Sequence, residues 1–65
     1  MKFILVHNAS DAEPIVINTE CIVYAEKSEL LTGATYIQTR DTEEYPSKGY
    51  HVTETPEQLL KMLND

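Results

Sequence analysis

The chain has 65 residues, of which 11 are acidic and 5 are basic, so its formal net charge at pH 7 is −6. A composition that is 42% hydrophobic and 25% charged is typical of a globular domain and argues against intrinsic disorder. The basic residues are isolated from one another, which argues against binding to nucleic-acid phosphates, and a single cysteine excludes a disulfide within the chain.

The first half of the chain is predicted to form three short strands. Residues 2–7 form a strand whose apolar run stops at His7, too short for a signal peptide or for a membrane span of about 20 residues. A polar turn follows, and Ile15–Ile17 is expected to be a second strand with apolar residues on both faces. A third strand is expected over Cys21–Ala25.

The second half begins with two further predicted strands. Gly33 lies in the loop after the third strand and is expected to adopt a positive φ angle. Thr35–Thr39 and Tyr50–Thr53 are rich in the β-branched and aromatic residues that favour strands. The polar stretch Arg40–Gly49 between them is expected to be a mobile connection.

The end of the chain carries the signature of a helix. Thr55–Gln58 fits a capping box, and Pro56 occupies the first helical position, where its missing N–H costs nothing. The helix is predicted to run from about Pro56 to Asn64. It would present an apolar stripe made of Leu59, Leu60, Met62 and Leu63.

These elements predict one α+β domain over residues 1–65. It would be a small antiparallel β-sheet, or a partly open barrel, of about five short strands with one C-terminal helix, because short connections favour antiparallel neighbours. The predicted core comprises Phe3, Leu5, Ile15, Ile17, Ile22, Tyr24, Ile37, Val52, Leu59 and Leu63.

Three residues could carry acid-base, nucleophilic or metal chemistry. His7 and His51 have no second ligand or nucleophile at a fixed spacing, so both are interpreted as strand-edge histidines. Cys21 follows an acidic residue in an acidic chain, which opposes thiolate formation, and we expect a small buried hydrophobe. The sequence therefore predicts no enzyme activity and no catalytic, cofactor or metal site.

An acidic cluster and a set of tyrosines are two further candidates for binding sites. Asp41, Glu43 and Glu44 lack the glycine and flanking helices of a calcium loop and are interpreted as a solvated loop. A stacking platform for single-stranded nucleic acid would need basic residues between its aromatic side chains, so cross-strand packing is the favoured interpretation, with Tyr45 expected to be exposed. The tyrosines concerned are Tyr24, Tyr36, Tyr45 and Tyr50.

Three segments carry a recognisable pattern: an apolar-x-apolar-Asn strand end at residues 15–18, a strand at residues 22–26, and the passage into the last helix at residues 52–58. In these segments and their spacing the chain resembles the small flagellar FlbD family of bacterial proteins. Residues 10–13 replace its tight Asn-Gly turn, and the connection at 41–48 is longer. The resemblance implies a flagellar role and brings no defined biochemical activity.

Residues 22–26 form an Ile-x-Tyr-x-Glu pattern, residues 35–39 a Thr-rich strand and residues 55–63 a capped helix. In these three segments the chain also resembles the LytTR DNA-binding domain. This resemblance implies a nucleic-acid-binding regulatory domain, which is the alternative interpretation of the function of this chain. A very small enzyme is a third class, and no cluster of residues favours it.

The favoured interpretation is a small non-enzymatic interaction or adaptor protein that self-associates as a homodimer. A 65-residue core supplies only about 3–5 kcal/mol without help, and one helix covers one sheet face, which would leave Ile4, Val6 and Val16 exposed. A partner protein is expected, without nucleic acid, membrane or cofactor, and the unpaired cysteine predicts a cytoplasmic location.

Overall fold

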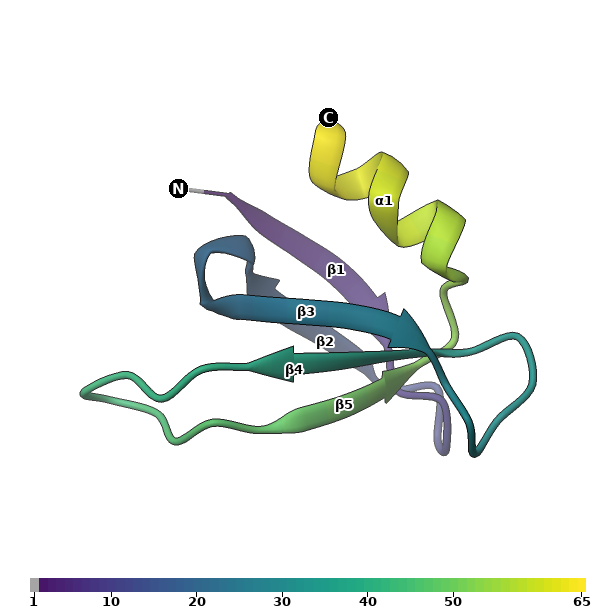
Figure 1. Ribbon diagram of the computed structural model, residues 1–65, viewed down its shortest axis with the longest axis horizontal. Helices are drawn as coiled ribbons and strands as arrows, with labels where there is room; N and C mark the ends of the chain where they lie inside the picture. The colour runs from purple at the N-terminus through teal and green to yellow at the C-terminus, as the bar shows by residue number, and fades with distance from the viewer. Residues whose placement is uncertain (1) are drawn as a thin grey trace.

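The computed structural model describes residues 2–65, which contain five strands, a short 3₁₀ turn and a C-terminal helix (Figure 1). In chain order these are β1 (Phe3–His7), β2 (Pro14–Asn18), η1 (Thr19–Cys21), β3 (Ile22–Lys27), β4 (Thr35–Thr39), β5 (Gly49–Val52) and α1 (Pro56–Asn64). The predicted α+β fold is confirmed. The strands divide between two antiparallel sheets, β1–β2 and β3–β4–β5, which do not close into a barrel.

The hairpin β1–β2 is closed by turn chemistry that the sequence predicts. The side-chain oxygen of Asn8 accepts hydrogen bonds from the backbone N–H and the hydroxyl of Ser10, each at 2.9 Å. Asp11 accepts from the backbone N–H of Glu13 at 3.0 Å, and Ala12 between them adopts a positive φ of 61°. Short polar side chains of this kind satisfy the backbone where the chain reverses.

The predicted inward face of β1 is wrong, because Ile4 and Val6 are buried while Phe3 and Leu5 are exposed. A strand with consecutive apolar residues does not reveal which alternate set faces the core. Pairing with β2 determines which set of β1 side chains faces the core. The inner face joins two apolar pairs, Ile4 with Ile17 and Val6 with Ile15, whereas on the outer face Phe3 lies opposite a polar residue.

The three-stranded sheet places Tyr24 on its outer face, where the prediction of a core position is wrong. Ile22 pairs with Thr39. Tyr24, two residues further along β3, pairs with the adjacent residue of β4, Gln38, because β3 carries an irregularity between Ile22 and Tyr24. The extra residue, Val23, reverses the alternation of β3. Cys21 was predicted to begin this strand and instead ends the η1 turn.

The inner face of β4 alternates two threonines with Ile37, and all three are buried. Thr35 donates its hydroxyl hydrogen to the carbonyl of Glu54 at 2.7 Å. Thr39 donates to the carbonyl of Lys48 and accepts from its N–H, both at 3.0 Å. These bonds offset the desolvation of two buried hydroxyls.

The two sheets meet where β1 ends beside the end of β5. Asn8 and Val52 form an isolated antiparallel bridge. The backbone N–H of Ala9 donates to the carbonyl of His51 at 2.7 Å, and that of Thr53 donates to the carbonyl of His7 at 2.8 Å. This corner lets the inner faces of both sheets share one core. Its buried side chains are Ile4, Val6, Ile17, Ile37, Val52 and Leu59.

The helix α1 begins and ends where the sequence predicts, and Gly33 has the predicted positive φ, 82°. The Thr55 hydroxyl accepts from the Gln58 N–H at 3.2 Å, and the Gln58 side chain accepts from the Thr55 N–H at 2.8 Å. Leu59 is buried, but Leu60 is exposed, contrary to the predicted stripe. At 3.6 residues per turn, positions i, i+3 and i+4 share one face and i+1 does not.

Candidate interaction surface

His7 is paired with Glu54 at the corner between the sheets. Glu54 accepts from the His7 backbone N–H at 3.0 Å, and its second oxygen lies 2.8 Å from Nδ1 of the ring. An ionised carboxylate only accepts hydrogen bonds, so Nδ1 carries the proton. Burial alone would raise the pKa of Glu54, but the bonds from His7 outweigh burial and hold that pKa below its ordinary value. The pair fastens β1 to the segment before α1.

His51 contacts Ser28, a pairing that sequence reasoning missed because the residues are 23 positions apart. The Ser28 hydroxyl lies 3.0 Å from Nδ1 of His51 and accepts from the backbone N–H groups of Leu30 and Leu31. With both acceptor sites of the oxygen used, its one hydrogen is left to donate to Nδ1. Ser28 is also buried. This hydroxyl orders the β3–β4 loop and is poorly placed to act as a nucleophile.

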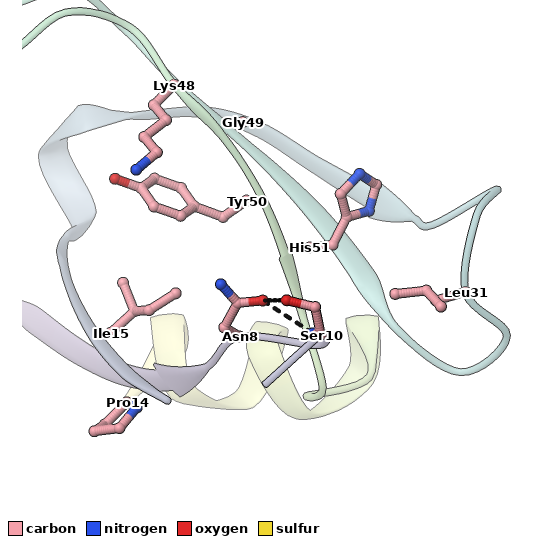
Figure 2. Close-up of a pocket in the computed structure, with 9 residues that line it drawn as sticks. All are labelled: Asn8, Ser10, Pro14, Ile15, Leu31, Lys48, Gly49, Tyr50 and His51. Atoms are coloured by element: carbon pink, nitrogen blue, oxygen red, sulfur yellow. Dashed lines mark hydrogen bonds between the residues drawn. The ribbon is translucent and has the colours of Figure 1, made fainter. Parts of the chain in front are cut away.

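A cleft of about 530 Å³ lies between β2, β5 and the first turn. Figure 2 shows that Tyr50 projects toward Ile15 of β2, whereas His51 projects to the other side of β5. Asn8 is already bonded to Ser10. The polar groups of the cleft therefore do not converge on one point, as the polar groups of a ligand site do. The lining residues are Asn8, Ser10, Pro14, Ile15, Leu31, Lys48, Gly49, Tyr50 and His51.

The tyrosines lie in three places and do not form one stacking platform. Tyr24 and Tyr36 lie together on the outer face of the three-stranded sheet, with ring centroids 6.2 Å apart, and Tyr36 packs on His51 at 5.0 Å. Tyr50 packs against the core. Tyr45 is 69% exposed in the β4–β5 loop, as predicted.

The outer face of the β1–β2 hairpin is apolar. Phe3, Leu5 and Val16 are 58%, 50% and 66% exposed, and we refer to these three side chains as the β1–β2 outer face. Leu5 and Val16 are direct cross-strand partners, and Phe3 is two residues from Leu5 on the same side of β1. Single exposed apolar residues are ordinary, but a contiguous group on one sheet face indicates an interaction site.

A groove adjoins this face. It has a volume of about 370 Å³ and lies between the β1–β2 hairpin, η1 and the β4–β5 loop. Its apolar walls include Phe3, Val16, Tyr45 and Pro46, and the half-buried Cys21 also lines it. We call this the Tyr45 groove. Sequence reasoning missed it, because four separate segments of the chain form it.

The acidic loop residues lie beside this groove. Glu43 and Glu44 are exposed and line a neighbouring cavity of about 500 Å³, which shares Phe3, Cys21 and Tyr45 with the groove. Asp41 has a structural role instead. Its carboxylate accepts a hydrogen bond from the backbone N–H of Ser47 and so helps to shape the loop. Within residues 2–65, no three histidine, cysteine or acidic side chains gather where they could hold one metal ion.

Comparisons with protein-family models, with curated proteins and with solved structures find no match to this chain. The resemblances to the flagellar FlbD family and to the LytTR domain therefore stay predictions. In the described part of the chain, no helix has the length and apolar character needed to cross a membrane.

Proposed function

We propose that this protein is a non-enzymatic interaction or adaptor module, and that it pairs with a second copy of itself through the β1–β2 outer face. The observation that carries the proposal is the contiguous exposure of Phe3, Leu5 and Val16 on one side of a hairpin. Burying such a group against an identical one removes apolar surface from both copies. It also adds stability that a 65-residue chain has few other means to obtain.

The proposed dimer is a weak one. A stable interface buries about 800 Å² per partner, which is roughly a sixth of this chain's 4691 Å² surface. Strands of five residues are about 17 Å long, so the hairpin alone presents less than that area. We therefore expect dissociation in the micromolar range, with neighbouring loop residues forming the rim.

The net charge of the chain predicts how self-association depends on salt. Each copy carries a formal charge of −6, so two copies repel one another at low ionic strength. Salt screens that repulsion over a Debye length of about 10 Å at 0.1 M. Association through an uncharged face is therefore expected to strengthen as salt is added. An interface held by ion pairs would weaken under the same change.

A cytoplasmic location belongs to the same proposal. Cys21 has no disulfide partner in the chain and lines a surface groove. An unpaired accessible thiol is typical of proteins in a reducing compartment.

Sedimentation at micromolar concentrations tests the proposal. Val16→Glu is expected to leave a folded monomer, because it places charge on the proposed interface. Val23→Glu is the matched control: Val23 is also a strand valine, is 60% exposed, and lies on β3. The control is expected to associate as the unmodified protein does. A monomeric unmodified protein, or equal effects of the two substitutions, would overturn the proposed dimer.

A further inference from the structure

The loop that forms one wall of the Tyr45 groove is held by its own hydrogen bonds. The Thr42 hydroxyl accepts from the Tyr45 N–H at 2.9 Å, and the Thr42 N–H donates to the Tyr45 carbonyl at 2.8 Å. Asp41 accepts from Ser47 as well. These bonds involve only backbone atoms of Tyr45 and leave its ring, which is 69% exposed, available to a binding partner. Hydrogen bonds already made within the loop backbone lower the ordering cost of binding.

The groove has room for one large side chain. Its apolar walls come from Phe3, Val16, Tyr45 and Pro46, and its volume is about 370 Å³. An aromatic or branched aliphatic side chain fits such a space and is the kind of anchor that dominates binding energy at protein interfaces. The main question is which chain supplies that anchor.

The charge around the groove favours a different protein, rather than a second copy of this chain, as the source of the anchoring side chain. Glu43 and Glu44 stand at its edge, whereas Arg40 is the one cation among the described residues that line it. A second copy brings a further formal net charge of −6, and its basic residues are scattered. Of these, Lys2 donates to the Met62 carbonyl and Lys48 lies 5.1 Å from the Tyr50 ring centroid. A cationic segment complements this edge, and the chain itself does not supply one.

We propose that the Tyr45 groove binds a peptide segment of a partner protein that carries one large apolar side chain flanked by lysine or arginine. The inference rests on the proposed role as an interaction module and names the chemistry of its partner. The apolar side chain enters the groove between Phe3 and Tyr45. The flanking cations lie against Glu43 and Glu44, where they add association rate and specificity more than affinity.

Selection of a displayed random dodecapeptide library on the immobilised protein tests this. The recovered peptides are expected to share an aromatic or branched aliphatic residue with lysine or arginine beside it. A synthetic copy of the best peptide is expected to bind at least tenfold more weakly to Tyr45→Ser, which removes the wall but keeps the loop's backbone bonds. The Glu43→Gln, Glu44→Gln double variant is expected to bind several-fold more weakly and to lose most of its salt dependence.

Matched controls separate the groove from general attraction to an acidic protein. Leu60→Ser removes a similarly exposed apolar side chain on α1, and Glu57→Gln removes an acid on the same helix. Both are expected to leave peptide binding unchanged. Recovery of acidic or purely polar peptides, no enrichment at all, or equal losses in the groove variants and these controls would overturn the proposal.

The outcome is separable from that of the proposed dimer. Leu5 belongs to the β1–β2 outer face and does not line the groove, so a Leu5→Glu monomer is expected to keep its affinity for the peptide. Peptide binding without any self-association would remove the dimer alone. Phe3 and Val16 belong both to the β1–β2 outer face and to the groove, so self-association and peptide binding compete, and the selection is repeated on the Leu5→Glu monomer. A Leu5→Glu monomer that recovers no basic peptide would remove the groove proposal alone. The two events also respond oppositely to salt.

Discussion

Gly49→Ala is expected to destabilise the protein through a clash with one tyrosine. Gly49 is the first residue of β5, and the ring of Tyr36 from β4 lies over it. A Cβ atom at Gly49 would lie 2.7 Å from Cε1 and Cζ of that ring and closer still to its hydroxyl oxygen. Real Cβ atoms do not approach carbon this closely, so the Tyr36 ring must move.

The size of the effect follows from what that ring does. Tyr36 packs against Tyr24 and His51 and donates its hydroxyl hydrogen to Gln38. Each aromatic contact contributes about 0.5–1.5 kcal/mol and the hydrogen bond about 1 kcal/mol. Loss of glycine's flexibility in the unfolded chain offsets about 0.4–1 kcal/mol. With part of the ring contacts retained after it moves, we expect a net loss of about 1–2 kcal/mol.

Urea unfolding measures this, and a double-mutant cycle identifies the cause. In a Tyr36→Ala background the clash is absent, so Gly49→Ala is expected to be neutral or slightly stabilising. Gly33→Ala is a contrasting control, because nothing lies within 4 Å of the added Cβ and only its positive φ of 82° causes strain. That control is expected to cost about 1 kcal/mol in both backgrounds, because an L-residue with a side chain is strained at a positive φ. A Gly49→Ala protein as stable as the unmodified one, or the same loss with and without Tyr36, would refute this reasoning.

Three further predictions concern the cap, the His7–Glu54 pair and nucleic acid. Thr55→Ala removes the helix cap and is expected to lower the free energy of unfolding by about 1 kcal/mol, seen as a lower urea midpoint; an unchanged midpoint would mean that another group caps α1. Because the pKa of Glu54 is lowered on folding, its ionised form stabilises the fold above its ordinary value of 4.5, and this contribution disappears as the pH falls through the lowered value. Urea midpoints between pH 7 and pH 3 are therefore expected to fall less steeply for Glu54→Gln, and parallel curves would contradict this. Five isolated basic residues against 11 acids predict no measurable binding to duplex DNA at physiological salt; micromolar binding in a low-salt titration that weakens steeply with salt would favour the LytTR-like alternative.

The elements that the sequence specifies well are those with local signals. The Thr55–Gln58 cap and the proline at the first helical position mark the start of α1 at the residue where it begins. The β-branched and aromatic run of β4 coincides with its observed bounds, and Gly33 takes the positive φ its loop requires. Each of these signals acts within a few residues, so tertiary context did not override it.

The features that could not be predicted depend on pairing between distant segments. Which face of β1 is buried depends on its register with β2, and a one-residue change of phase exchanges Phe3 and Leu5 for Ile4 and Val6. The irregularity in β3 that turns Tyr24 outward has no marker such as glycine. The Tyr45 groove could not be predicted for the same reason, because its walls come from segments that are distant in the sequence. Exposure of Val16 was predicted and is confirmed, although Ile4 and Val6 were wrongly placed beside it.

Intermolecular nuclear Overhauser effects in a mixed sample of isotope-labelled and unlabelled protein test the central proposal most directly. The β1–β2 outer face predicts contacts between the methyl groups of Leu5 and Val16 in one copy and the same face of its partner, including the Phe3 ring. Their intensity is expected to rise with salt as charge repulsion is screened. Intermolecular contacts located at Val23 or Leu60 instead, or none at concentrations well above micromolar, would contradict self-association through this face.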